Sequence, residues 1–219
     1  AAMVTGGRVR IPAWPGATTQ AGDAWRALLG HMGATITLDE EGLTLSGPGA
    51  GNYPGIKATM AEVGELTPTL AAICAYASSP SHLSGIAHLR GHETDRLAAL
   101  VTEINRAGGQ ADETEDGLII TPRPLHAAQI CSYADHRMAT FGAILGLVTP
   151  AITVDDITCT SKTLPTFEAM WASLVGGEGR GNTDAEGNTD AEGSTEGQAH
   201  ADDHRTTLAT PASPIEEEQ

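Results

Sequence analysis

The nine residues His-Leu-Arg-Gly-His-Glu-Thr-Asp-Arg at positions 88–96 bring together side chains suited to acid–base chemistry and anion binding. They include two histidines, two arginines and two acidic residues. Apolar residues follow with the spacing of a helix that buries one face, at Leu97, Leu100, Val101 and Ile104. The charged residues therefore mark a helix N-terminus, where unpaired N–H groups and the helix dipole favour anions. The simpler alternative is a helix cap with solvated charges.

An internal repeat places other ionisable residues at comparable helix starts. A helix followed by a hairpin is predicted twice, about 75 residues apart, at 21–46 and 94–121. A second pattern, a helix followed by a short strand, recurs about 70 residues apart at 65–86 and 135–154, and a last helix is predicted to open at Lys162. Helices and strands that alternate in repeated units predict an α/β domain.

Five residues at these helix starts form the predicted site. If the units are related by rotation, the helix N-termini converge on one pocket. Arg96, Arg137 and Lys162 would then bind a multiply charged anion such as a phosphorylated carboxylate, through bidentate guanidinium contacts and a lysine point charge. Two carboxylates in the same place, Glu65 and Glu93, would serve as acid and base. For each residue alone, the simpler interpretation is a surface ion pair.

The composition separates a domain from an acidic tail. The chain has 219 residues and a formal net charge of −16, and residues 176–219 carry eleven acidic residues against two arginines. This tail repeats Gly-Asn-Thr-Asp-Ala-Glu and has almost no large apolar residue, so it is predicted to be disordered. The acidity of both parts argues against binding to nucleic acid, which needs a basic face.

Cysteine usage and hydropathy predict a cytoplasmic protein. Cys74, Cys131 and Cys159 are odd in number and far apart, which indicates reduced thiols instead of disulfides or a zinc site. The longest uncharged run, 138–154, is interrupted by two glycines and a proline, which favours a buried helix and a strand over a membrane span. No signal peptide is recognisable, and no membrane association is expected.

Five segments of the chain carry a resemblance to a known family. They read Gly-Glu-Leu-Thr-Pro at 64–68, His-Leu-Arg-Gly-His-Glu-Thr-Asp-Arg-Leu at 88–97, Asp-Gly-Leu-Ile-Ile at 116–120, Ser-Tyr-Ala-Asp-His-Arg-Met-Ala at 132–139 and Thr-Ser-Lys-Thr-Leu-Pro at 160–165. In this order they resemble the C-terminal half of the 5-enolpyruvylshikimate-3-phosphate synthases, most closely the actinobacterial forms. The Glu-Thr-Asp-Arg and Asp-His-Arg-Met-Ala blocks are the most specific.

The resemblance implies a fold and a reaction. The family has two similar domains, each an inside-out α/β barrel of three repeated βαβαββ-type units, with helix N-termini that face the cleft between the domains. The implied reaction transfers the enolpyruvyl group of phosphoenolpyruvate to the 5-hydroxyl of shikimate 3-phosphate, on the pathway to chorismate and the aromatic amino acids. It requires neither a metal ion nor an organic cofactor.

The resemblance also implies roles for individual residues. Glu65 stands where the family has an acidic residue that contacts the shikimate hydroxyl and takes its proton, and Glu93 where a glutamate delivers a proton to the methylene carbon of phosphoenolpyruvate. Arg96, Arg137 and Lys162 match the cations that bind phosphoenolpyruvate. His88 and His92 match residues that contact shikimate 3-phosphate, although many members have Asn and Lys there.

A domain is expected to be missing. The resemblance makes residues 1–175 the C-terminal domain, followed by the tail at 176–219, while the family's N-terminal domain with its own phosphate and shikimate ligands has no counterpart. The chain alone is therefore predicted to be inactive or nearly so. The full-length protein is expected to be a monomer.

Three alternatives remain open from the sequence. The first is the related enolpyruvyl transferase that acts on UDP-N-acetylglucosamine. The second is metal-dependent hydrolysis, because His88 and His92 are four residues apart beside Glu93; however, the order of residues is not that of the zinc-protease motif, and Gly91 disfavours one continuous helix. The third is a non-catalytic remnant of the family.

Overall fold

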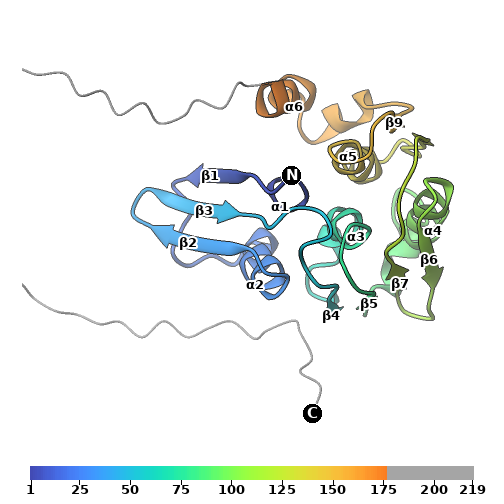
Figure 1. The fold of residues 1–219 in the computed structure, drawn as a ribbon, viewed down its shortest axis with the longest axis horizontal. Helices are drawn as coiled ribbons and strands as arrows, with labels where there is room; N and C mark the ends of the chain where they lie inside the picture. The colour runs from blue at the N-terminus through green and yellow to red at the C-terminus, as the bar shows by residue number, and fades with distance from the viewer. Residues whose placement is uncertain (177–219) are drawn as a thin grey trace, which may run out of the picture.

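In the computed structural model, which describes residues 1–176, the middle of the chain folds as one complete repeat (Figure 1). Its elements are β4 (Lys57–Thr59), η2 (Gly64–Leu66), α3 (Thr67–Cys74), β5 (Ser81–Ser84), η3 (Ala87–Gly91), α4 (Arg96–Arg106), β6 (Gln110–Glu113) and β7 (Leu118–Thr121). The sheet order is β4-β5-β7-β6, with β4 parallel to β5 and the other pairs antiparallel. This succession is the expected βαβαββ unit.

The first unit repeats the second half of this pattern. It contains α1 (Ala2–Thr5), β1 (Arg8–Pro12), η1 (Ala21–Asp23), α2 (Ala24–His31), β2 (Thr35–Asp39) and β3 (Gly42–Ser46). The sheet order β1-β3-β2 matches β5-β7-β6, and all its pairs are antiparallel. The hairpin predicted at the end of the 21–46 segment is confirmed as β2 and β3, with Ile36 opposite Leu45.

The third unit repeats the first half. It contains β8 (Gln129–Ile130), α5 (His136–Leu145), β9 (Thr153–Val154), η4 (Thr158–Lys162) and α6 (Phe167–Gly176). Strands β8 and β9 are parallel, as β4 and β5 are. The last predicted helix is confirmed as α6, but it begins at Phe167 and not at Lys162, where a 3₁₀ turn ends. The Asp156 carboxylate accepts bonds from the backbone and the hydroxyl of Thr158, which favours a tight local turn.

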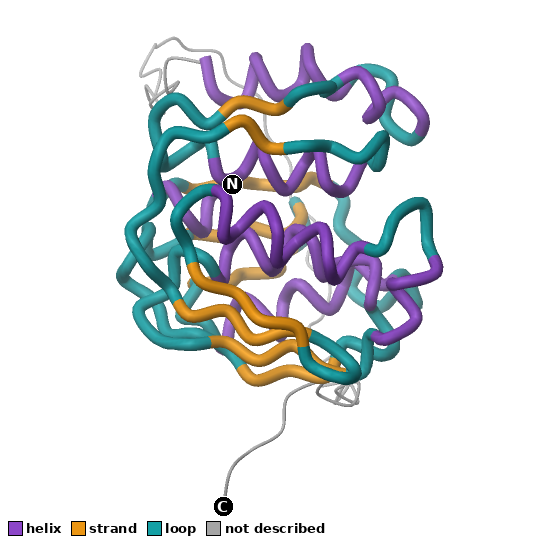
Figure 2. Tube along the Cα trace, turned by 90° about the vertical axis from the view of Figure 1, so that its right-hand side faces the viewer, coloured by secondary structure: helices purple, strands orange, loops and turns teal. Residues whose placement is uncertain are grey.

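The core consists of helices, with the sheets outside. Every residue of α3 except Thr69 is buried, and α3 packs along α5. A helix that is apolar on all sides is typical of a protein core. The burial of Leu70 and of Ile73 each contributes about 1.5–3 kcal/mol to the stability of the fold. Figure 2 shows the central helices side by side, with strands below them and further strands above them, under the uppermost helix. This arrangement is the expected inside-out α/β domain.

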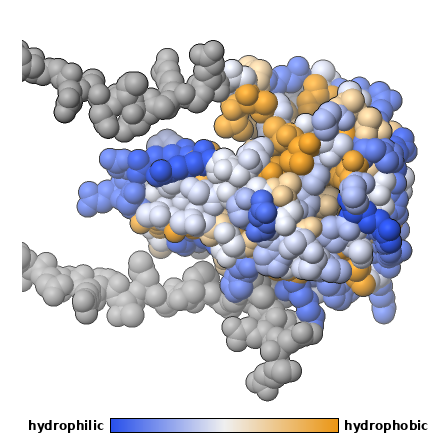
Figure 3. All heavy atoms as spheres, in the orientation of Figure 1, coloured by the Kyte–Doolittle hydropathy of each residue, from blue (hydrophilic) through white to orange (hydrophobic). Residues whose placement is uncertain are grey.

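Helix α6 carries an apolar face that this part of the chain leaves open. Met170, Leu174 and Val175 are each more than half exposed, and Figure 3 shows hydrophobic side chains gathered around α6. In the complete unit the corresponding helix, α4, packs against β6. Within residues 1–176 no hairpin equivalent to β6 and β7 follows α6. The predicted disordered tail lies outside the described residues, apart from Gly176, which ends α6.

None of the helices in residues 1–176 has the length and the apolar character that crossing a lipid bilayer requires. The uncharged run at 138–154 forms most of α5, a turn and β9, as predicted.

Candidate active site

The ionisable residues at the helix starts lie at one end of the domain. Glu65 lies in η2 just before α3, Arg96 is the first residue of α4, and Lys162 is the last residue of η4. His136 and Arg137 are the first two residues of α5. Because each βα connection of the repeated unit returns the chain to the same end of the core, side chains from the second and third units can meet there.

Aspartates cap the two helices that contribute most to this end. Asp95 caps α4 by accepting a bond from Ala98 N at 3.1 Å, and Asp135 caps α5 by accepting one from Arg137 N at 2.8 Å. The sequence predicted that Thr94 begins the first of these helices; the structure begins it at Arg96 because the Asp95 side chain satisfies the free N–H group. By contrast, no side chain caps the 3₁₀ turn η1, which opens the first predicted helix, at 21–32.

A buried ion pair joins α4 to α5 at their N-termini. Arg96 Nε lies 2.7 Å from Asp135 Oδ2 and Nη2 lies 3.4 Å from Oδ1, and the two side chains are only 3% and 0% exposed. Burial alone would raise the pKa of Asp135, but the bonds from Arg96 and from Arg137 N, with the charge of Arg96, hold it below its ordinary value. Burial would lower the pKa of Arg96, but its acidic partners hold it above its ordinary value.

Glu65 is the carboxylate around which three basic side chains gather. Its Oε2 lies 3.1 Å from Arg96 Nη1 and also contacts Arg137 Nε, and its Oε1 lies 3.2 Å from His92 Nδ1. Its backbone carbonyl accepts a bond from Arg137 Nη1 at 2.8 Å. A carboxylate held between two guanidiniums is a hydrogen-bond acceptor in a fixed place, suited to orient a hydroxyl group and receive its proton.

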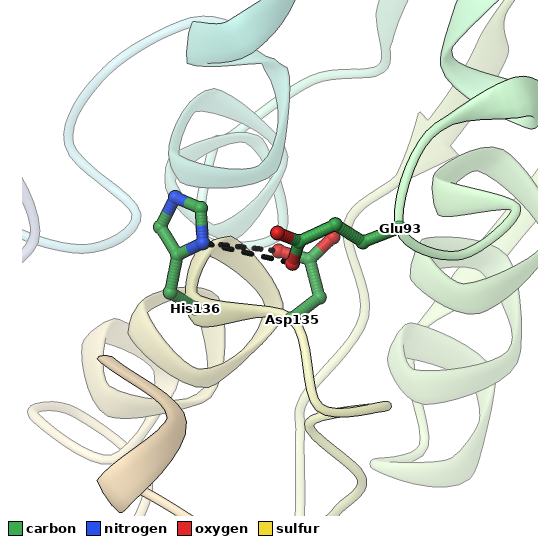
Figure 4. A group of neighbouring side chains, drawn as sticks. All are labelled: Glu93, Asp135 and His136. Carbon is green, nitrogen blue, oxygen red and sulfur yellow. Dashed lines mark ion pairs between the residues drawn. The ribbon is translucent and has the colours of Figure 1, made fainter. Parts of the chain in front are cut away.

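Glu93 lies beside Asp135 and His136, as Figure 4 shows. Its Oε2 is 3.7 Å from His136 Nδ1 and 3.9 Å from Lys162 Nζ, and the latter also donates to Ala134 O at 3.1 Å. The side chains of Glu93 and Lys162 are 41% and 54% exposed, so both can reach a ligand at the surface. An exposed carboxyl beside an imidazole and an ammonium can exchange protons with a bound substrate.

Glu93, Asp135 and His136 have the residue types of a metal site. Their potential ligand atoms all lie within 4.8 Å of one another. However, Asp135 already accepts bonds from Arg96 and from Arg137 N, and the Lys162 ammonium stands beside Glu93. A divalent cation there would compete with two fixed positive charges, so this donor set fits a metal ion poorly.

The two histidines of the cluster are not on one helix. Residue 88 lies in η3, which ends at Gly91, and α4 begins only at Arg96. The rings of His88 and His92 are tilted, with centroids 5.8 Å apart, and His92 Nδ1 lies 3.2 Å from both Glu65 Oε1 and Arg96 Nη1. A helical pair of zinc ligands is therefore not formed, and His92 belongs to the Glu65 cluster.

The structure brings the sequence-predicted residues into one connected group. Direct contacts join Glu65 to His92, Arg96 and Arg137, while Glu93 contacts Lys162, and His88 adjoins both His92 and the Gly64 backbone. The sequence places Asp135 and His136 at the same helix start as Arg137, but sequence analysis gave neither a role in the site. A carboxylate directly before a helix can both cap it and hold a neighbouring cation, but the sequence does not show which cation that is.

Comparison with known proteins identifies the fold as that of an enolpyruvyl transferase domain. Residues 1–171 match the family model for EPSP synthase, 3-phosphoshikimate 1-carboxyvinyltransferase. The fold is similar to EPSP synthase from Acinetobacter baumannii, with a TM-score of 0.69 and 25% identity, covering 80% of this chain and 43% of that one. It is also similar to the enolpyruvyl transferase NikO from Streptomyces tendae, with a TM-score of 0.60 and 16% identity, covering 79% and 40%.

The chain belongs to the EPSP synthase family. It is 58% identical over 179 residues to 3-phosphoshikimate 1-carboxyvinyltransferase of the actinobacterium Kocuria rhizophila. This alignment covers 82% of the chain but only 40% of the relative. The predicted family and its actinobacterial character are thereby confirmed, and the chain spans well under half the length of this relative.

Proposed function

We propose that this chain supplies one half of the active site of an enzyme that transfers the enolpyruvyl group of phosphoenolpyruvate to the 5-hydroxyl of shikimate 3-phosphate and releases phosphate. The observation that carries the proposal is the meeting of Arg96, Arg137 and Lys162 with Glu65 and Glu93 at one end of the domain. A phosphorylated carboxylate needs several fixed cations, and the addition needs a base and an acid near them.

Each residue then has a chemical role. Arg96, Arg137 and Lys162 bind the phosphate and carboxylate of phosphoenolpyruvate. Glu65 accepts the proton of the 5-hydroxyl group while the hydroxyl oxygen bonds to the enol carbon of phosphoenolpyruvate. Glu93 delivers a proton to the methylene carbon. When the bond between the enol carbon and the phosphate oxygen breaks, phosphate leaves and Glu93 helps to remove a proton from the new methyl group. This step restores the carbon–carbon double bond and gives the enol ether product.

His88, His92 and Glu65 contact shikimate 3-phosphate in this proposal. No metal ion and no organic cofactor take part, because fixed cations provide the charge stabilisation that a metal ion would otherwise supply.

The proposal requires a second domain. The side chains of Glu65, Glu93 and Lys162 are 43%, 41% and 54% exposed, so this half of the site is open on one side. Because an enzyme excludes water by closing its site, we propose that the family's N-terminal domain completes the cleft and that this chain alone has little or no activity. The complete enzyme would be a monomer.

We also place the complete enzyme in the cytoplasm, without nucleic-acid or membrane partners. Cys74, Cys131 and Cys159 are all free thiols, which supports a reducing compartment.

The test joins this chain to an N-terminal domain of its family. The complete protein is assayed for phosphate release from phosphoenolpyruvate with shikimate 3-phosphate or with UDP-N-acetylglucosamine as acceptor. Turnover is expected with shikimate 3-phosphate as the acceptor and not with the nucleotide sugar. Turnover with the nucleotide sugar instead would overturn the proposed acceptor. Growth of an aromatic auxotroph carrying the complete protein, and no growth with this chain alone, would separate an enzyme half from a non-catalytic remnant.

A matched pair of variants tests the site itself. Glu93→Gln is expected to lower kcat about 1000-fold, within the usual range for losing a general acid. Glu115→Gln changes an exposed glutamate in the turn between β6 and β7 and should leave kcat unchanged. Equal activity of the two variants would contradict the role of Glu93.

A further inference from the structure

The loop between β8 and α5 has an unusual backbone. Tyr133 and Ala134 are consecutive residues with φ values of 55° and 54°, in the left-handed region that non-glycine residues rarely enter. One such residue is common in turns, but two in succession without glycine are costly. They persist only where neighbouring groups hold the backbone in place.

A buried glutamate from another repeat unit holds this loop. Glu103, on α4, has a fully buried side chain whose Oε2 accepts a bond from Cys131 N at 3.1 Å, while its Oε1 accepts one from the Tyr133 hydroxyl at 2.7 Å. Arg106 Nε lies 3.3 Å from the same carboxylate. Partial burial and the nearby Glu103 carboxylate both raise the pKa of Tyr133, which keeps its hydroxyl protonated to a higher pH than an ordinary tyrosine.

The loop leads directly to the cations of the candidate site. The carbonyl of Ala134 accepts the bond from Lys162 Nζ at 3.1 Å. The next residue, Asp135, holds Arg96 through the buried ion pair. Of the two left-handed residues, Tyr133 is therefore bound by Glu103, while Ala134 carries the carbonyl that binds Lys162 and directly precedes the aspartate that binds Arg96. If the loop relaxed, both contacts would shift together.

We infer that Glu103 and Tyr133 form a clamp that holds the 133–134 backbone in its left-handed conformation and so sets the spacing of Arg96 and Lys162 for an anionic substrate. This inference rests on the proposed function and makes both residues positioning residues. The hydrogen bonds of their side chains go to each other, to Cys131 N and to Arg106, and none joins Glu65, Glu93 or the three cations. The clamp acts on the substrate only through the loop.

The experiment uses the complete enzyme with two tyrosine variants. Tyr133→Phe removes the hydroxyl that bonds to Glu103 and keeps the ring. Tyr76→Phe is the matched control, because the Tyr76 hydroxyl donates to Leu145 O at 2.7 Å, at the far end of the same helix α5. Tyr133→Phe is expected to raise KM for phosphoenolpyruvate about tenfold, whereas Tyr76→Phe should change only the unfolding midpoint.

A second substitution tests the backbone directly. Glycine adopts the left-handed conformation without steric cost, so Ala134→Gly in the Tyr133→Phe background should restore most of the lost affinity for phosphoenolpyruvate. A purely structural role of Tyr133 would give no such rescue.

The outcomes separate the two claims. A complete wild-type enzyme without turnover would overturn the proposed function and this inference with it. If the wild type is active, two results would overturn the inference alone. One is a Tyr133→Phe variant with the wild-type KM for phosphoenolpyruvate, and the other is an added Ala134→Gly substitution that fails to lower the raised KM.

Discussion

Arg96 and Lys162 carry the same charge and lie in the same candidate site, but the protein holds them in opposite ways. Arg96 is 3% exposed and lies between Asp135, Glu65 and His92. Lys162 is 54% exposed, with one bond to Ala134 O and Glu93 at 3.9 Å. The buried guanidinium cannot move without disturbing the fold, whereas the lysine can. Mutations should therefore separate stability from ligand binding.

The largest effect is expected when Arg96 loses its buried partner. Asp135→Ala leaves a guanidinium without its main counter-charge and removes the cap of α5, so the free energy of unfolding should fall by about 3 kcal/mol or more. Urea unfolding of the chain measures this loss. Asp39→Ala is the control, because its pair with Arg10 is exposed on both sides and should contribute much less. Equal losses in the two variants would contradict the comparison.

Removing the exposed cation should affect only ligand binding and turnover. Lys162→Ala in the complete enzyme is expected to lower kcat/KM for phosphoenolpyruvate about 100-fold, because a charge-assisted contact to the anion is lost. The free energy of unfolding should change by less than about 0.5 kcal/mol, as for most surface substitutions. Arg123→Ala, which alters an exposed cation that bonds to Gln110, serves as the control for a general charge effect. A Lys162 variant as unstable as Asp135→Ala would contradict this prediction.

The buried pair should also lose its stabilising effect in acid. Because the folded state lowers the pKa of Asp135, the unfolded chain takes up this proton at a higher pH than the folded chain does. The stabilisation is complete above the ordinary aspartate pKa of about 4 and is lost as the pH falls through the lower folded value. Asp135→Asn keeps a capping side chain without the charge. The difference in unfolding free energy between wild type and this variant should therefore shrink from pH 7 to pH 3, and a constant difference would contradict the assignment.

The smallest expected effect concerns His92, which shares the Glu65 cluster with Arg96. A lysine ammonium carries a permanent charge near neutral pH and is a good ligand for a phosphate group. His92→Lys in the complete enzyme should therefore lower KM for shikimate 3-phosphate a few-fold. Measuring KM, with His126→Lys outside the site as control, would test whether residue 92 contacts the substrate.

Much of the site could be predicted because its residues stand at helix starts. The apolar spacing after Arg96 and the uncharged helix after Asp135 located two of these starts within two residues. The two hairpins were also readable: polar and apolar residues alternate in the first, and a short polar turn that ends in glycine lies in both. The strands β4 and β8 were missed because two or three residues are too few to show any periodicity.

The sequence by itself determined the repeated α/β units, the family and the residue types gathered at the helix starts, because periodicity and motif spacing are local properties. Only the tertiary structure decided which of those residues meet. Arg96 and Asp135 are 39 residues apart, and Glu103 and Tyr133 are 30 apart, and each pair forms only because α4 and α5 pack around a shared core. A buried charge must find its partner in space, and the linear sequence does not state which partner that is.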